Sequence, residues 1–453
     1  MPAQHLIRQT TAQFFAPLSQ TRYNIRVLYR YRVLGLLFLL SIITYLDRVC
    51  ISVAGPRMQA DLGIDPTGWG WVVGAFTLSY AAFEIPSGAW GDRYGPRKVL
   101  TRIVLWWSLF TTLTGAVSVI SGALSVFTGA VSTFAVLLAV RFFFGAGEAG
   151  AYPNSASAIS KWFPTHERAR ATGTVWMASR IGGALTPLIV VPIQVAFGWR
   201  ATFYCFGILG LIWCCVWYWW YRDYPFEKQG VTKVEMDEIG AGTTREHHSL
   251  PWAKVLRKRN FWTILLMYHT YCWGSYFYLS WLHTYLQKGR GFTENEMRYL
   301  SPLPFIAGAC GNFFGGWLSD HLVKSHGLKF GRGIVGTCGL AMAGFFLMSA
   351  AFVPGKLPAV ICLALGYGSM DCMLPVAWAI CLDVGRKYGG AVSGSMNMAG
   401  QMGSFLSSVT FGYMVAYFGN YNDPLKPLAF MLFVSAFIFW QINPNEQLVT
   451  GDT

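Results

Sequence analysis

The sequence predicts an all-α membrane protein, with twelve transmembrane helices arranged as two pseudo-symmetric six-helix bundles. Three observations support this prediction: the composition, twelve apolar runs of similar length, and one motif that occurs twice. Of the 453 residues, 54% are hydrophobic and only 12% are charged, whereas soluble domains have about 25% charged residues. So few charges cannot cover the surface of a soluble protein. The 33 Phe, 22 Tyr and 19 Trp also exclude a disordered chain.

Each of the twelve apolar runs is long enough to cross about 30 Å of hydrocarbon as a helix, which satisfies its own backbone hydrogen bonds there. The segment 115–133 is apolar, uncharged and rich in small residues. It is compatible with an extension of the third helix, an external loop, or a segment that dips into the membrane. The expected spans are 33–55, 68–91, 99–120, 134–158, 170–197, 201–221, 261–286, 299–319, 332–353, 357–382, 390–418 and 426–442.

The distribution of Lys and Arg predicts the orientation. If the N-terminus is inside, the internal segments hold 25 of these residues and the external segments hold seven. Positive residues favour the cytoplasmic side, so we expect a multi-pass protein of the cell membrane with both termini in the cytoplasm. The net charge of +14 then requires no nucleic-acid partner, and the loops are expected to attract anionic lipid. Residues 1–32 do not have the pattern of a cleaved signal peptide.

A polar interval at about 222–259 divides the chain midway and predicts two halves. The segment Gly88-Ala-Trp-Gly-Asp92 follows the second span, and Gly316-Trp-Leu-Ser-Asp320 follows the eighth, 228 residues later. Internal repeats of this kind are typical of secondary transporters. The expected divisions are a cytoplasmic segment 1–32, a bundle 33–221, a cytoplasmic loop 222–260, a bundle 261–442 and a cytoplasmic tail 443–453.

The loop after the second span continues as Asp92-Arg93-Tyr-Gly95-Pro-Arg97-Lys98. Together with the degenerate copy that ends at Asp320 and the six-plus-six arrangement, it resembles the major facilitator superfamily, over essentially the whole chain from residue 33 onward. The resemblance implies a central cavity between two halves that open alternately to each side. It also implies that the motif controls conformation, through Gly88, Asp92, Arg93, Gly95, Arg97 and Asp320.

Shorter motifs are similar to those of the anion:cation symporter family, which includes bacterial hexuronate and sugar-acid transporters and relatives of the vesicular glutamate and sialic-acid carriers. The most diagnostic are Tyr45-Leu-Asp47-Arg48 in the first span and the Arg141 to Glu148 spacing in the fourth. The sequence departs from the family at Glu84, where a neutral amide is more frequent, at Asp371, an unexpected acid in span ten, and at Gly385, which replaces a proline.

The charged residues within the spans are the candidates for transport chemistry, because each costs at least about 2.5–3.5 kcal/mol to insert into a bilayer. Arg141 and Glu148 are seven residues apart, nearly on one helical face and about 10 Å apart along the axis. Arg48 and Arg141 are expected to bind a substrate carboxylate, since guanidinium groups match it as a fork.

Asp47 and Glu148 are expected to couple transport to protons, because the proton affinity of a buried acid changes with burial and with a nearby Arg. Protonation of Glu148 would then free Arg141 for the substrate. The alternative is a structural salt bridge, either Asp47 to Arg141 or Glu148 to Arg48. For Glu84 and Asp371 the sequence leaves open an added proton site or a buried neutral acid that bonds a neighbouring helix.

Polar and aromatic side chains are expected to complete the substrate site. By the resemblance, Tyr80 and Trp378 match family positions that contact the substrate, and Asn397 is suited to bond hydroxyl groups. Aromatic residues also gather at helix interfaces and membrane boundaries, so packing is the alternative for each of them. His269 is interpreted as a packing residue. The remaining candidates for the substrate site are Tyr45 and Tyr276.

The predicted function is a monomeric secondary active transporter that imports a monovalent organic anion, preferably a sugar acid, by proton symport. A phosphate or short-carboxylate symporter and a drug:proton antiporter are the alternatives, although an antiporter would favour acids and aromatics without two arginines. A membrane sensor would need a long extension, and the tail after residue 442 is short. An enzyme is not expected, because no nucleophile–base set is present. The ten cysteines lie in apolar segments without metal-site spacing, so we expect no metal and no cofactor.

Overall fold

The structure is a computed structural model that describes residues 28–128, 131–240 and 251–448. A few side chains inside these ranges, that of Asp92 among them, are not described. The described residues form helices and no strand. The first half contains α2 (Tyr29–Leu62), α3 (Pro66–Tyr94), α4 (Pro96–Gly115), α5 (Val117–Thr128), α6 (Thr133–Glu148), α7 (Ala151–Trp162), α8 (Thr165–Phe197) and α9 (Trp199–Trp220). After it come η1 (Pro225–Glu227), α10 (Lys233–Ile239) and α11 (Trp252–Val255). The second half contains α12 (Arg259–Ser280), α13 (Leu282–Thr284), η2 (Tyr285–Gly289), α14 (Glu294–Leu300), α15 (Pro302–His326), α16 (Leu328–Phe352), α17 (Lys356–Gly385), η3 (Arg386–Tyr388), α18 (Gly389–Phe418) and α19 (Leu425–Gln441).

Helix ends follow local sequence signals. At the start of α3, the Asp65 carboxylate accepts a hydrogen bond from the Gly68 N–H, and Pro66 occupies the first helical position. Ser132 caps α6 by accepting from the Ala135 N–H. Gly63 ends α2 with φ 63°, a left-handed conformation that favours glycine.

Each of the twelve expected spans falls on a described helix or on a run of adjoining helices. Six helices are long and apolar enough to cross a membrane by length and composition alone, and the bent pair of α4 and α5 is a seventh candidate. The helices α3, α12, α15 and α18 have 22 to 30 residues, enough to cross about 30 Å. Glycine, serine and aromatic residues lower the mean hydropathy of these four helices, so a hydropathy criterion alone does not identify them as membrane spans.

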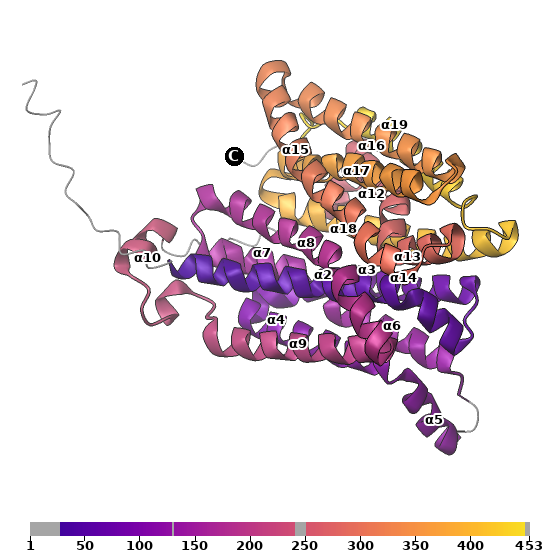
Figure 1. Cartoon of the computed structure of the whole chain (residues 1–453). Coiled ribbons are helices and arrows are strands. Elements are labelled where there is room, and N and C mark those ends of the chain that lie inside the picture. The colour runs from indigo at the N-terminus through magenta and orange to yellow at the C-terminus, as the bar shows by residue number, and fades with distance from the viewer. Residues whose placement is uncertain (1–27, 129–130, 241–250, 449–453) are drawn as a thin grey trace, which may run out of the picture.

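The segment 115–133 forms a helix of its own. After α4 ends at Gly115, α5 turns away from it by 78°. Of the three interpretations left by the sequence, a straight extension of the third helix is wrong, and the expected span 99–120 is five residues too long. Figure 1 shows α5 projecting from the body of the molecule.

The fourth span is also interrupted, between α6 and α7. Ala149 has extended backbone angles and Gly150 has φ 89°, so the helix stops at Glu148 and restarts at Ala151. A Cβ at Gly150 would lie 2.5 Å from Cβ of Ser87. Glycine is therefore required at this position both by the backbone angle and by the close approach of α3.

The two halves repeat the same local packing. A Cβ added at Gly88 would lie 3.6 Å from Pro153, and one added at Gly316, in the second copy of the motif, would lie 3.7 Å from Pro375. In each half, a glycine of the second span therefore packs against a proline of the fourth. Small residues at such contacts let membrane helices approach closely.

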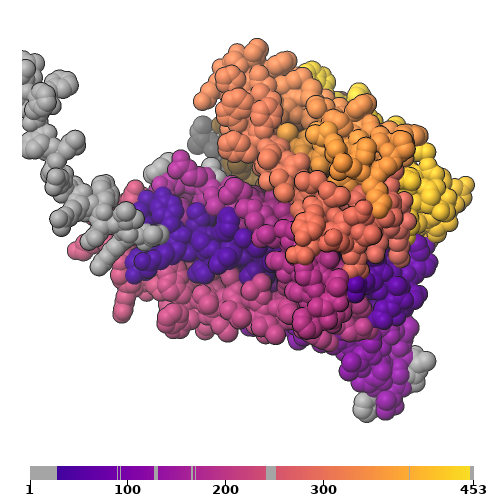
Figure 2. All heavy atoms as spheres, in the orientation of Figure 1, coloured from indigo at the N-terminus to yellow at the C-terminus, as the bar shows by residue number. Residues whose placement is uncertain are grey.

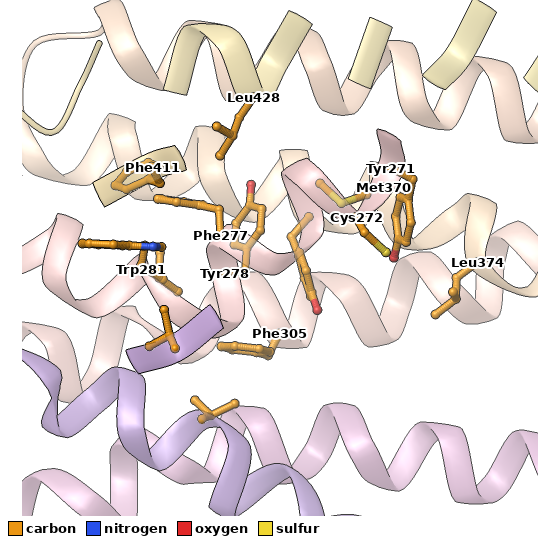
Figure 3. Packing of buried hydrophobic residues seen from close by; sticks show 14 of the residues in the cluster. Tyr271, Cys272, Phe277, Tyr278, Trp281, Phe305, Met370, Leu374, Phe411 and Leu428 are labelled. Atoms are coloured by element: carbon orange, nitrogen blue, oxygen red, sulfur yellow. The ribbon is translucent and has the colours of Figure 1, made fainter. Parts of the chain in front are cut away.

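The halves are joined unequally along their length. Figures 1 and 2 show them in contact beside α13 and α14 and separating towards the end that carries α10. We call these the α13–α14 end and the α10 end. One buried apolar cluster contains residues of both halves, for example Trp69 of α3 and Phe411 of α18. Figure 3 shows part of this cluster, including residues of α12, α15, α17, α18 and α19. A second cluster belongs to the first half, with Tyr276 of α12 packed into it.

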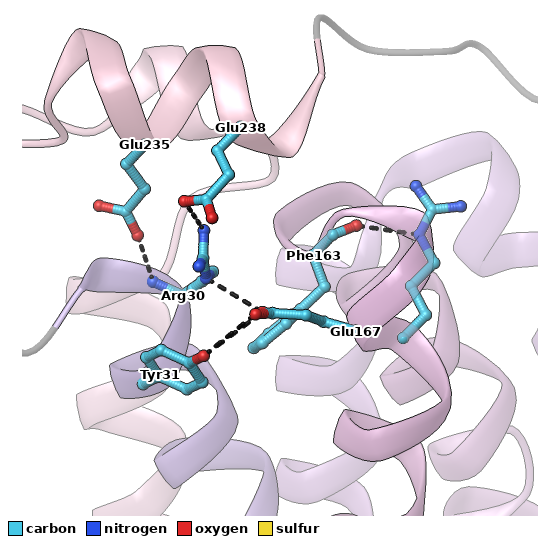
Figure 4. A network of polar contacts seen from close by, with 7 residues as sticks. Arg30, Tyr31, Phe163, Glu167, Glu235 and Glu238 are labelled. Atoms are coloured by element: carbon cyan, nitrogen blue, oxygen red, sulfur yellow. Dashed lines mark hydrogen bonds and ion pairs between the residues drawn. The ribbon is translucent and has the colours of Figure 1, made fainter. Parts of the chain in front are cut away.

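The helix α10 of the central loop is fixed to the first half (Figure 4). The Arg30 guanidinium in α2 donates to Glu238 at 2.7 Å, and its backbone N–H donates to Glu235 at 2.9 Å. The Arg30 Nε lies 3.2 Å from Glu167 of α8. This network ties α10, α2 and α8 together, so the start of the central loop belongs structurally to the first half.

Candidate functional site

The candidate site is built around the middle of α2. Residues 43–56 of this helix are buried without interruption, so this part of α2 has no face that is free for lipid. Asp47 and Arg48 lie within this stretch, and their charges therefore point into the protein. The helices packed against α2 are α7, α8 and α9 of the first half and α12 and α13 of the second.

Arg48 forms an ion pair inside a cage of aromatic rings. Its Nε donates to the Glu148 carboxylate, and both side chains are almost fully buried. The guanidinium carbon lies 4.8 Å from the ring centre of Tyr80, 5.4 Å from Phe76 and 5.6 Å from Tyr45. Aromatic faces attract cations in such places, so the cage stabilises the arginine without competing for its hydrogen bonds.

Glu148 is the last residue of α6, directly before the helix break. Its carboxylate accepts a hydrogen bond from Arg48 of α2. This is one of the two salt bridges that the sequence offered as alternatives, and the spacing of Arg141 and Glu148 was already too long for a tight direct pair. A spacing of seven residues puts the two groups about 10 Å apart along a helix, whereas α2 brings Arg48 into direct contact with Glu148.

Arg141 and Asp47 are buried close to this pair but are not joined to each other by a described hydrogen bond. The Arg141 guanidinium carbon lies 4.6 Å from the ring centre of Phe144 and 5.4 Å from that of Phe76. Among the described residues, neither carboxylate oxygen of Asp47 has a hydrogen-bond partner, and neither does Nε of Arg141. Of the two structural salt bridges considered from the sequence, the structure contains Glu148 to Arg48.

A third buried arginine, Arg180 of α8, was not identified by the sequence reasoning. Its Nε lies 2.7 Å from the Asp371 carboxylate, its Nη2 donates to the same group at 3.0 Å, and its Nη1 donates to the Tyr367 hydroxyl at 2.9 Å. Both partners belong to α17, so this pair connects the two halves. A search for every ionisable residue inside the predicted spans would have found Arg180, since it lies well within 170–197.

The candidates of the second half also face the first half. Asn397 of α18 donates a hydrogen bond to Glu84 of α3, so Glu84 bonds a neighbouring helix, as one of its two interpretations proposed. The Trp378 ring lies 5.5 Å from Trp176 of α8, centre to centre. The structure therefore places these two candidates of the second half against α3 and α8 of the first.

Several buried polar atoms of these side chains have no hydrogen-bond partner among the described residues. Most buried polar groups in proteins are hydrogen-bonded, so these atoms are candidates for contacts with a ligand. The donors can bind carboxylate oxygens, and the acceptors can bind hydroxyl groups or protons. The atoms are Nη2 of Arg48, Oε2 of Glu84, Oε2 of Glu148, Nε1 of Trp378 and Oε1 of Gln401.

The first copy of the loop motif is organised around a sharp turn. Gly95 has φ 83°, and it separates α3 from α4. The Arg97 guanidinium donates twice to the Tyr218 carbonyl, at 2.7 and 3.0 Å, and its backbone N–H donates to Asp223 at 2.9 Å. Burial raises the pKa of the Asp223 carboxyl, and the hydrogen bond from Arg97 opposes that shift.

The other charged residues of the motif differ in their surroundings. Arg93 is exposed, with its guanidinium carbon 5.3 Å from the ring centre of Tyr94. The side chain of Asp92 lies outside the described residues. In the second copy, Asp320 accepts from Arg332 at 2.8 Å. The hydrogen bonds of Arg97 and of Asp320 therefore each join residues of one half.

Polar contacts lock the halves together at the α13–α14 end. The Arg57 guanidinium of α2 donates to both Glu294 oxygens of α14, at 2.6 and 2.7 Å. His283 of α13 is fully buried and bridges the hydroxyls of Ser52 and Ser301, at 3.0 and 3.1 Å. Opening the molecule at this end requires these contacts to break.

Comparison with known proteins agrees with this architecture. The sequence profile of the Major Facilitator Superfamily matches residues 37–408. A probable sulfoacetate transporter of Cupriavidus necator is 35% identical over 94% of this chain and 96% of its own length. The hexuronate transporter of Bacillus subtilis is 29% identical over 86% of this chain and 89% of its own length. A probable galactarate/D-glucarate transporter of Escherichia coli is 26% identical, over 87% and 89%.

Solved structures confirm the fold. A bacterial homologue of the human lysosomal transporter Spinster, in an inward-facing and occupied conformation, superposes with a TM-score of 0.71 and 19% identity, over 91% of this chain and 97% of that one. The xylose transporter of E. coli, in an inward-open conformation, gives a TM-score of 0.70 and 15% identity, over 91% and 96%. The expected all-α fold of two six-helix bundles is therefore correct.

The lock between Arg57 and Glu294 yields a first prediction. Arg57→Ala removes a partly exposed ion pair worth about 1 kcal/mol, so the α13–α14 end should open more often. We expect amide hydrogen exchange in α14 to become about fivefold faster, as measured by mass spectrometry on the purified protein.

Arg200→Ala is the matched control, because Arg200 pairs with Asp61 at 2.8 Å within the first half. It removes an ion pair near the same end without touching α14. Equal exchange rates in the two variants would show that Arg57 does not hold the halves together.

Proposed function

The chain belongs to the Major Facilitator Superfamily, and from that premise we propose that it imports a small organic anion in symport with protons. The family and the named relatives are transporters, so the chain is a transporter of the multi-pass membrane class rather than an enzyme. The observation that carries the proposal is the buried Arg48–Glu148 pair, in which Nη2 of the arginine and Oε2 of the acid have no hydrogen-bond partner in the described part of the chain.

Arg48 is the proposed primary anion site. A carboxylate binds a guanidinium group through two parallel hydrogen bonds. Because Nη2 of Arg48 has no hydrogen-bond partner among the described residues, it is available as a donor for a substrate oxygen beside Glu148. Arg141 adds a second positive charge beside the same Phe76 ring. The hydroxyl or indole groups proposed to orient the substrate belong to Tyr45, Tyr80, Tyr276 and Trp378, with the amide of Asn397.

Proton coupling follows from competition for Arg48. While Glu148 is ionised it holds the arginine, and an incoming anion would meet an uncompensated negative charge in a medium of low dielectric. A proton on Glu148 removes that charge and frees the guanidinium for the substrate. Loss of the proton reverses the exchange, so substrate and proton bind together and leave together. Asp47 beside Arg141 is the proposed second acid of the coupling machinery.

The substrate class is proposed from the charges and supported by the relatives. Arginines in the site favour an anion, and unpaired acceptors favour hydroxyl groups. The relatives are named for sulfoacetate, hexuronate and galactarate/D-glucarate transport, so the proposed substrate is a sugar acid or a similarly small acid. Buried arginines disfavour a drug:proton antiporter, whose cationic cargo they would repel.

Alternating access and topology complete the proposal. The two halves, 33–221 and 261–442, are proposed to rock around the site, with the contacts at the α13–α14 end closing one entrance. The loop motifs would steady the α10 end, which we propose to be cytoplasmic together with both termini, the segments 1–32 and 443–453, and the loop 222–260. The basic residues of the loops support this orientation.

Proton-driven uptake tests the proposal directly. In liposomes with an acidic exterior, the purified protein should accumulate labelled galacturonate, galactarate or sulfoacetate above the outside concentration. Arg48→Ala should lower uptake by about 100-fold or more, because it removes a buried charge partner, while Arg200→Ala should leave uptake unchanged. Efflux of lipophilic cations without uptake of any organic anion would reverse the assignment.

Glu148→Gln separates binding from coupling. The amide mimics the protonated acid, so we expect substrate exchange across the liposome membrane to continue while a pH gradient no longer drives accumulation. Glu296→Gln is the control, because the Thr293 N–H and Lys356 lower the pKa of Glu296 to about 2 and it stays ionised throughout the assay. A Glu148→Gln protein that still concentrates substrate would remove this residue from the coupling role.

A further inference from the structure

We propose that Arg180 is a second anion anchor, and that the preferred substrate is a small acid with two anionic ends that bridges Arg48 and Arg180. This inference rests on the proposed function, because it names the substrate class of the same site. It differs from the sequence expectation, which places a monovalent acid on Arg48 and Arg141.

The geometry places both arginines beside one tyrosine. The guanidinium carbon of Arg48 lies 5.6 Å from the ring centre of Tyr45, and that of Arg180 lies 5.9 Å from the same ring. Tyr45 carries a hydroxyl that can donate to a substrate oxygen. A short acid bound beside this ring therefore has two guanidinium groups and one hydroxyl donor within reach.

The two arginines are held in matching ways. Each is buried, each is paired with one acid on another helix, and each acid is at most 1% exposed: Glu148 for Arg48 and Asp371 for Arg180. Burying an ion pair brings little net stability, because desolvation offsets the attraction. Two such pairs beside one ring therefore suggest a role beyond stability, and anion exchange at both arginines accounts for them.

Charge balance then sets the number of protons. With both acids ionised, the two pairs are neutral together. A doubly charged substrate that replaces both acids would leave two uncompensated negative charges, so one proton on Glu148 and one on Asp371 restore neutrality. A singly charged acid satisfies only one arginine and leaves the other pair intact.

The position of Arg180 links substrate binding to the movement of the halves. Arg180 belongs to α8, whereas Asp371 and Tyr367 belong to α17. When a substrate replaces Asp371 as the partner of Arg180, the direct ion pair between the halves is lost. The substrate then connects the two halves instead. Only an acid with two anionic ends can bind Arg48 and also separate Arg180 from Asp371. It is therefore the substrate whose binding best controls the movement of the two halves.

Uptake of galactarate and galactonate in liposomes tests this inference, because the two acids differ only at one end, carboxylate against hydroxymethyl. The informative variant is Arg180→Gln with Asp371→Asn, which removes both buried charges together and leaves neither unpaired. We expect kcat/KM for galactarate to fall about 30-fold or more, and that for galactonate to stay within about threefold.

Arg180→Lys keeps the charge and the native Asp371, so it carries the test if the double variant does not fold. It should also lose selectivity for galactarate over galactonate, because an ammonium group lacks the guanidinium fork. Equal losses for both acids, no loss for galactarate, or a wild-type protein that carries galactonate but neither galactarate nor sulfoacetate would overturn the role of Arg180. A wild-type protein that accumulates no organic anion would instead overturn the proposed function itself.

Discussion

The structure depends on one constraint: a permanently charged arginine in the middle of a buried helix must be matched by an anion. Arg48 cannot lose its charge, so the protein surrounds it with aromatic rings and holds it with Glu148. Glu148 is the last residue before the break between α6 and α7, and its carboxylate contacts α2. In our proposal, a substrate anion and Glu148 are alternatives for the same partner, and a proton decides between them.

In our proposal, the same constraint links an exchange of charges at the site to the contacts between the two halves. Arg48 is paired within the first half, whereas Arg180 is paired across the interface with α17. The halves are further tied by Arg57 with Glu294 and by His283 at the α13–α14 end. Polar contacts thus run from the site to one entrance, while the other end separates (Figure 2). In our proposal, neutralising the acids of the site weakens the ties that hold this state.

Much of the fold was predictable, because span lengths and the 228-residue repeat are properties of sequence alone. The bend before α5 was not, since 115–133 is apolar throughout and hydropathy carries no sign of a turn. For the candidate site, the sequence supplied the residue types, and Arg48, Glu148 and Asn397 do contact partners on other helices. The Glu148–Arg48 salt bridge was one of two alternatives from the sequence, and spacing could not choose between them, because the contact depends on how α2 packs. Arg180 escaped notice because no motif marks it.

The central claim is that substrate and Glu148 compete for Arg48, with a proton deciding the outcome. Net proton exchange on binding measures this most directly: calorimetric titration of the purified protein near neutral pH, in buffers of different ionisation enthalpy, gives the protons bound with each substrate molecule. The account predicts net proton uptake by the wild-type protein, and about one proton fewer per substrate in Glu148→Gln. Binding without proton uptake, or the same uptake in both proteins, would contradict it.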